Sequence, residues 1–141
     1  PPRGASVSRH AIITFARVDA GQYIDDSRNM KTKQALSAFA ALSQETRLEA
    51  FRQLVRLTPK GIPAGELARD LDVPASTLSS HLAILERAGL VSSERQGRIV
   101  LYRADLDGAR DLVQFLVRDC CRGQPERCAQ LLAAAMPACC P

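Results

Sequence analysis

Five cysteines lie within the last 22 residues of this 141-residue chain, namely Cys120, Cys121, Cys128, Cys139 and Cys140. A disulfide scaffold would spread its cysteines through the core that they link, and a bond between sequence neighbours is strained. The odd number and the two adjacent pairs therefore favour a reducing, cytoplasmic environment. There, such thiols act as ligands for soft ions or as redox groups.

A second group of chemically useful residues lies on one expected helix, residues 75–88. At about 100° per residue, Leu78, Leu82 and Leu85 share one narrow apolar stripe. The remaining surface is small, hydroxylated or basic and includes Ser76, Thr77, Ser79, Ser80 and His81. A helix face that is merely solvated usually carries Lys and Glu, so this face favours close approach to the base edges and phosphates of DNA.

Several elements must position that helix. Apolar spacing and stop signals predict helices over residues 36–40, 45–57 and 64–71, and Ser43 is the candidate N-cap of the second. In that second helix, one apolar stripe is expected from Leu48, Phe51, Leu54 and Val55.

A β-hairpin is predicted after the polar helix. The β-rich runs 90–95 and 99–104 flank a turn, which places three candidate DNA contacts near the tip: Arg95, Gln96 and Arg98. A helix, a short turn, a second helix with a small polar face and a basic hairpin together predict a winged helix-turn-helix. The fold class is therefore mainly α with a β-hairpin wing.

The last part of the chain is expected to be helical. Asp105 can cap a long helix over residues 106–121, for which Gly123 and Pro125 are stop signals. A lesser helix is predicted over residues 126–136.

Composition and charge narrow the function further. With 46% hydrophobic and 24% charged residues, the chain resembles one globular domain, and it has no apolar stretch long enough to span a membrane. The net charge of +4 separates into +1 for residues 1–30, +4 for 31–104 and −1 for 105–141. The basic middle favours a polyanionic partner.

Five short motifs follow one another in an order that resembles the ArsR/SmtB family of winged-helix metalloregulators. They are residues 42–48 (LSQETRL), 66–68 (ELA), 76–82 (STLSSHL), 85–91 (LERAGLV) and 96–103 (QGRIVLYR). The match covers about residues 33–121. It implies a repressor, not an enzyme, that is a homodimer paired through its first and last helices. Such a repressor leaves double-stranded operator DNA when an effector binds.

The resemblance also bears on the effector site. Pro63, Gly65 and Ala68 stand where one arsenic-sensing version carries its thiols, and a zinc-type site would need histidines on the last helix. The chain has only His10 and His81, neither on that helix.

The remaining trio, Cys120, Cys121 and Cys128, resembles the site of arsenite-responsive members at the end of the last helix. Three thiols suit As(III), and by the same chemistry Sb(III), because the trivalent ion binds three sulfurs in a pyramid. Zn(II) would need a fourth ligand, such as Asp119, Glu126 or a tail cysteine.

Two other readings stay open. A regulator of the same fold could sense thiol oxidation or a metal such as Zn(II) or Cd(II), and a thiol enzyme or soft-metal carrier could use Cys139 and Cys140. We expect no required cofactor. Residues 1–29 are expected to be a leader or a misassigned start, 30–121 the DNA-binding and dimerisation domain, and 122–141 a cysteine-containing tail.

Overall fold

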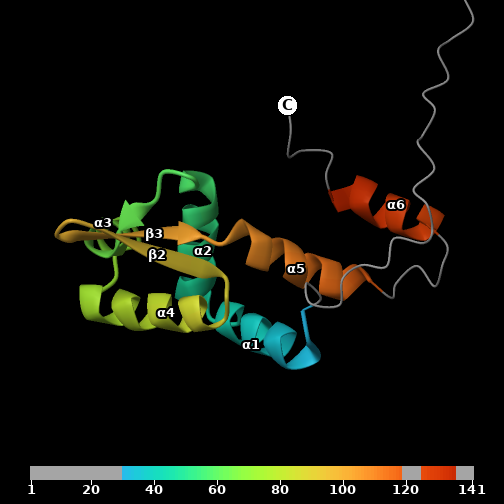
Figure 1. Ribbon diagram of the computed structural model, residues 1–141, viewed down its shortest axis with the longest axis horizontal. Coiled ribbons are helices and arrows are strands. Elements are labelled where there is room, and N and C mark those ends of the chain that lie inside the picture. Colours follow the sequence, from blue (N-terminus) through green and yellow to red (C-terminus); the bar gives the residue numbers. More distant parts are fainter. Residues whose placement is uncertain (1–29, 119–124, 136–141) are drawn as a thin grey trace, which may run out of the picture.

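A computed structural model describes residues 30–118 and 125–135 of the chain. Within these ranges the chain forms a helix-turn-helix followed by a β-hairpin wing, so the predicted fold class is confirmed (Figure 1). The elements are α1 (Thr32–Leu42), α2 (Glu45–Leu57), β1 (Ile62–Pro63), α3 (Ala64–Asp70), α4 (Ala75–Arg87), β2 (Val91–Gln96), β3 (Ile99–Ala104), α5 (Leu106–Val117) and α6 (Pro125–Ala135).

The first two helices meet at a sharp corner, and the predicted cap at this corner is wrong by one residue. Ser43 ends α1, and its hydroxyl donates to the Ala40 carbonyl at 2.8 Å. Gln44 has the extended backbone that an N-cap needs, and its side chain accepts from the Arg47 amide at 2.8 Å. Helix α1 is also longer than the predicted range 36–40, since it begins at Thr32.

The core is built from leucines that converge from α2, α3, α4 and the start of the wing. The largest fully buried side chains are those of Leu54, Leu67, Leu78, Leu82, Leu85 and Leu90. The stripe predicted for α4 is thus confirmed. The stripe predicted for α2 is only partly correct, because Leu54 is buried whereas Leu48 and Val55 are 42% and 39% exposed.

The sheet has three antiparallel strands in the order β1-β3-β2. The hairpin agrees with the prediction, and Gly97 at its turn has a φ of +62°, as the first turn residue of a type II′ hairpin requires. Strand β1 was not predicted. It has only two residues, too few for a period-two pattern, and it exists because Ile62 pairs with Tyr102 on β3.

Helix α5 leaves the wing at its predicted cap, where a carboxylate oxygen of Asp105 accepts from the Gly108 amide at 2.9 Å. It ends at Val117, so the prediction that it runs to residue 121 is wrong. The lesser helix predicted over residues 126–136 is confirmed as α6, which begins one residue earlier at Pro125, because the first position of a helix needs no N–H donor. No helix in residues 30–118 or 125–135 is long and apolar enough to cross a membrane. The expected leader, residues 1–29, lies outside the described residues.

Candidate nucleic-acid interface and cysteine segment

The turn between α3 and α4 sets the direction of the polar helix. Asp72 adopts a left-handed φ of +52°, and the Val73 and Asp72 amides donate back to the Ala68 and Arg69 carbonyls at 3.0 and 3.2 Å. This pattern is a Schellman motif, in which glycine is the usual residue at the left-handed position. The turn ends α3 after Asp70 and lets α4 start at Ala75.

Helix α4 presents the small polar surface that its sequence predicts. Ser76, Thr77, Ser79 and Ser80 are all exposed, while the leucines of the opposite stripe are buried. The Ser79 and Ser80 hydroxyls donate to the Ala75 and Ser76 carbonyls at 2.9 and 3.2 Å. Each hydroxyl oxygen still has lone pairs for an incoming donor.

His81 differs from the serines on the same helix. It is half-buried, and its Nδ1 atom is buried with no hydrogen-bond partner among the described residues. Of the five α4 residues predicted to contact DNA, His81 therefore has the smallest exposed fraction.

The register of the wing separates its two faces. Ser93 pairs with Tyr102 and Arg95 with Val100, so all four lie on one face. This is the face toward α4, because the Ser93 hydroxyl donates to a Glu86 carboxylate oxygen at 2.6 Å. Arg95 therefore starts from the side of the wing that faces the polar helix, where its Nε donates back to the Gly97 carbonyl of the turn at 3.2 Å.

The opposite face of the wing carries Gln96, which pairs with Ile99. Further along this face, Arg103 forms an ion pair with Glu94 and donates through Nε to the Pro59 carbonyl at 2.7 Å. Arg98 follows Gly97 in the turn and is exposed. The structure thus places the three wing candidates together near the tip, but Gln96 and Arg95 on different faces.

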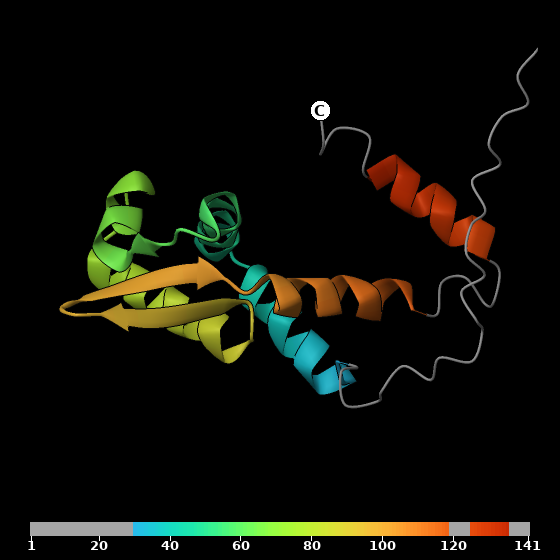
Figure 2. The ribbon, with the colours of Figure 1, turned by 45° about the horizontal axis from the view of Figure 1, so that its top comes forward.

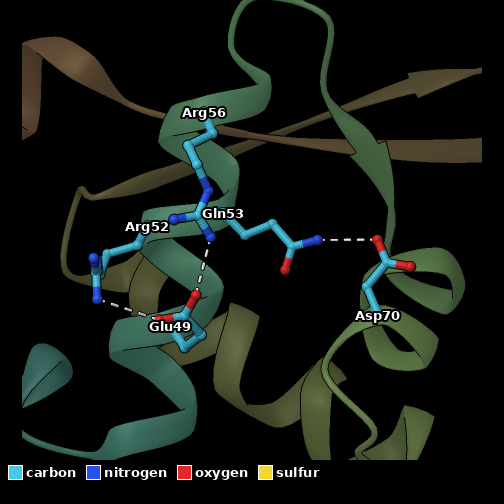
Figure 3. A network of polar contacts seen from close by, with 5 residues as sticks. All are labelled: Glu49, Arg52, Gln53, Arg56 and Asp70. Atoms are coloured by element: carbon cyan, nitrogen blue, oxygen red, sulfur yellow. Dashed lines mark hydrogen bonds and ion pairs between the residues drawn. The ribbon is translucent and has the colours of Figure 1, made fainter.

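Helix α2 holds α3 in place through a polar contact on the surface. The Gln53 amide donates to an Asp70 carboxylate oxygen at 2.9 Å, and Figure 3 shows this bond spanning the two helices. One turn away, Glu49 receives ion pairs from Arg52 and Arg56 at 3.5 and 3.0 Å. Both arginines are therefore paired within α2.

A separate apolar surface lies on α1 and α5, which contact each other on the side of the molecule away from the wing tip (Figures 1 and 2). Leu36 on α1 is 62% exposed, and Val113 and Leu116 on α5 are 52% and 58% exposed. Exposed large apolar side chains on two helices that contact each other are candidates for an interaction site.

The cysteine segment follows this surface directly. Cys120 and Cys121 come shortly after the end of α5, in the stretch 119–124 that lies outside the described residues. Cys128 lies in the first turns of α6, and its side chain is outside the described set, as are Cys139 and Cys140. Among the residues that are described, no group of three or more His, Cys, Asp or Glu side chains could hold a metal ion.

The comparisons with known proteins agree with this geometry. A helix-turn-helix domain family matches residues 42–94. An uncharacterized HTH-type transcriptional regulator of Bacillus subtilis, YbzH, is 30% identical over 95 residues, which are 59% of this chain and 95% of that protein. An ArsR-like transcriptional regulator from Rhodococcus sp. RHA1 superimposes with a TM-score of 0.57 at 30% identity, covering 75% of this chain and 95% of the other. The chain belongs to the ArsR/SmtB family of transcriptional regulators.

Relatives of this ArsR/SmtB-family regulator also include longer proteins. An uncharacterized HTH-type regulator of Methanocaldococcus jannaschii is 42% identical over 72 residues, and the match covers 50% of this chain but only 18% of that protein. The match therefore covers only part of each of these two proteins.

Two positions that organise this regulator were not singled out from the sequence. Asp72 takes a conformation that glycine usually fills, and Gly108 lies against the turn after α4. The Asp72-Val73-Pro74 break signals the turn but not its left-handed residue. Nothing local to Gly108 reveals its neighbour, because the contact joins residues far apart in the chain.

Proposed function

We propose that this regulator is a homodimeric repressor that binds operator DNA through α4 and the wing and releases it when As(III) binds Cys120, Cys121 and Cys128. The DNA surface combines exposed hydroxyls on α4 with Arg95 on the same side of the wing. Small side chains let a recognition helix approach base edges in the major groove, while arginines on a wing bind the phosphate backbone.

Dimerisation would use the apolar surface of α1 and α5. Leu36, Val113 and Leu116 are exposed apolar side chains, and a two-fold axis would cover them with the same surface of the partner. A symmetric dimer would then present two α4 helices to successive major grooves, about 34 Å apart.

The effector proposal rests on one observation, the position of the cysteines relative to two helices. Helix α5 ends at Val117, α6 begins at Pro125, and the trio spans the connection between them. Three thiols can replace the three hydroxyl groups of neutral As(OH)3, which releases three waters and leaves no uncompensated charge. Sb(III) would bind in the same way.

Release would follow because α5 takes part in the proposed dimer surface and also leads into the cysteine segment. Drawing the end of α5 toward the start of α6 would change the packing of α5 against its counterpart in the dimer, and with it the spacing of the two α4 helices. Allosteric couplings of this kind are typically about 1–3 kcal/mol, which corresponds to about 5- to 150-fold in affinity.

The test is fluorescence anisotropy of the reduced full chain on a duplex from its own promoter region, titrated in parallel with As(III), Zn(II) and peroxide. We expect As(III) to release the DNA. Cys120→Ser and Cys128→Ser should bind DNA as the parent does but stay bound under As(III). The paired substitution of Cys139 and Cys140 by serine is the matched control, and it should release normally.

Other outcomes would overturn the effector assignment and leave DNA binding intact. Release by Zn(II) but not As(III) would indicate a divalent-metal sensor. Release by peroxide that a thiol reductant reverses, with no response to As(III), would indicate a redox sensor that forms a disulfide.

A further inference from the structure

The recognition helix α4 ends in a tight turn at Gly89, a residue that has no side chain. Gly89 has a φ of +74°, its amide donates to the Glu86 carbonyl, and the Leu90 amide donates to the Leu85 carbonyl, both at 3.0 Å. This is a second Schellman motif. The Gly89 carbonyl is then the backbone group that helix α5 contacts.

Helix α5 meets that carbonyl with its own backbone. A Cβ atom built on Gly108 would lie 1.9 Å from the Gly89 oxygen and 3.0 Å from the Gly89 carbon. Real Cβ atoms do not approach backbone atoms so closely, and a carbonyl held in a helix-terminal turn cannot rotate away. The hydrogen that Gly108 carries in place of Cβ therefore points toward the oxygen, in the manner of a weak C–H···O contact.

One hydrogen bond joins the residue after the α4 turn to the start of α5, and a second caps the first turn of α5. The Asp105 amide donates to the Leu90 carbonyl at 2.9 Å, and the Asp105 carboxylate accepts from the Gly108 amide at 2.9 Å. The end of α4 and the first turn of α5 thus form one rigid corner, since every contact named here is made by backbone or by a capping side chain.

We propose that Gly108 is a positioning residue for DNA recognition. By allowing backbone contact between α5 and the end of α4, it sets the angle of the recognition helix relative to the helix that bears the apolar surface of Val113 and Leu116. Helix α4 has 13 residues. Its length is about 20 Å, so a small displacement at its C-terminal end moves the DNA-facing serines at its other end.

The contact matters for specificity more than for general DNA affinity. Hydrogen bonds to base edges require the helix to be placed within a fraction of an ångström, whereas attraction to phosphates tolerates a tilt. An added methyl group at residue 108 should therefore weaken operator binding while it leaves binding to unrelated DNA in place.

The experiment compares Gly108→Ala with Gly65→Ala in the full chain. Gly65 is the matched control because it is also a helical glycine, and a Cβ there would meet nothing within 4 Å. Anisotropy is measured on the promoter duplex and on a scrambled duplex of the same composition, without any metalloid. Size-exclusion chromatography and circular dichroism establish that each variant is folded and has the assembly state of the parent.

We expect Gly108→Ala to bind the promoter duplex at least tenfold more weakly and the scrambled duplex within about twofold of the parent. Gly65→Ala should keep the parent's ratio of promoter affinity to scrambled-duplex affinity. A parental ratio for a folded Gly108→Ala would overturn the proposal, and so would an equal loss on both duplexes, because that is the result of general destabilisation.

A second variant decides the matter if Gly108→Ala does not fold. Asp105→Ala removes the acceptor for the Gly108 amide and adds no atom against Gly89. It should lower the ratio of promoter to scrambled affinity by about threefold, and an unchanged ratio would overturn the proposal. Because no effector is present, these results are independent of whether As(III) is the ligand.

Discussion

The hydroxyl of Ser93 on β2 donates to a carboxylate oxygen of Glu86 on α4 at 2.6 Å. This bond ties the wing to the recognition helix and identifies which side of the hairpin faces the same direction as α4. Together with the strand register, it separates wing residues that are adjacent in sequence but lie on opposite faces.

The first prediction concerns Arg95 and Gln96. Arg95→Ala should weaken binding to all DNA sequences similarly and lower the slope of log affinity against log salt by about 1, because one phosphate contact is lost. Gln96→Ala removes a neutral side chain on the opposite face and should leave the slope unchanged. The measurement is a salt titration of DNA affinity by anisotropy. Equal slopes for the parent and Arg95→Ala would contradict the phosphate contact.

Arg98 gives a second, separate prediction at the same tip. It is exposed in the turn, and Arg98→Ala should also reduce affinity for every sequence and flatten the salt dependence by about 1. An unchanged slope for this variant would show that the turn residue does not reach the backbone. The Gln96→Ala control applies here as well.

The third prediction concerns the two left-handed helix ends. Asp72→Gly removes the strain of a left-handed aspartate at a φ of +52° and should raise the free energy of unfolding by a few tenths to about 1 kcal/mol. Gly89→Ala introduces such strain at a φ of +74°, where a Cβ meets no neighbour. It should lower the free energy of unfolding by about 1–2 kcal/mol. Urea denaturation measures both values. We expect the two variants to change the free energy of unfolding in opposite directions. A loss of stability in Asp72→Gly would show that the aspartate stabilises the turn by another route.

The fourth prediction tests the apolar surface of α1 and α5. Leu116→Lys places a charge where we propose the dimer contact, so it should shift the protein toward monomer and lower operator affinity at least tenfold. Val55→Lys is the control, because Val55 is an exposed apolar residue on α2 instead. Analytical ultracentrifugation reports the assembly state. A fully dimeric Leu116→Lys would place the dimer contact elsewhere.

The fifth prediction follows from linkage between the two proposed ligands. If As(III) weakens operator binding by some factor, operator DNA must weaken As(III) binding by the same factor. Isothermal titration of As(III) into the free protein and into its complex with the promoter duplex measures that factor directly. Equal As(III) affinity in both titrations would rule out release by this coupling.

Much of the fold follows from local pattern. The leucine spacing in α4 specifies a helix, because side chains that repeat every 3.6 residues share a buried face. The β-rich runs on either side of a Gly-containing two-residue turn specify a hairpin. Asp105 is recognisable as a cap for the same reason, since its carboxylate acts within one turn. The order of the motifs was sufficient to indicate the family.

The details that decide function depend on contacts between distant residues. Strand β1 exists only because Ile62 and Pro63 pair with β3. Leu48 and Val55 match the apolar stripe of a core helix, but the described chain covers them only in part. Whether Arg95 or Gln96 faces the side of α4 depends on a register that local composition does not encode. Gly108 looks like an ordinary helical glycine until α5 folds back onto Gly89. Apart from strand β1, sequence therefore determined which elements form and which residues could do chemistry. Tertiary structure alone decided which of these residues share a face of the molecule, because the shared faces depend on how the elements pack.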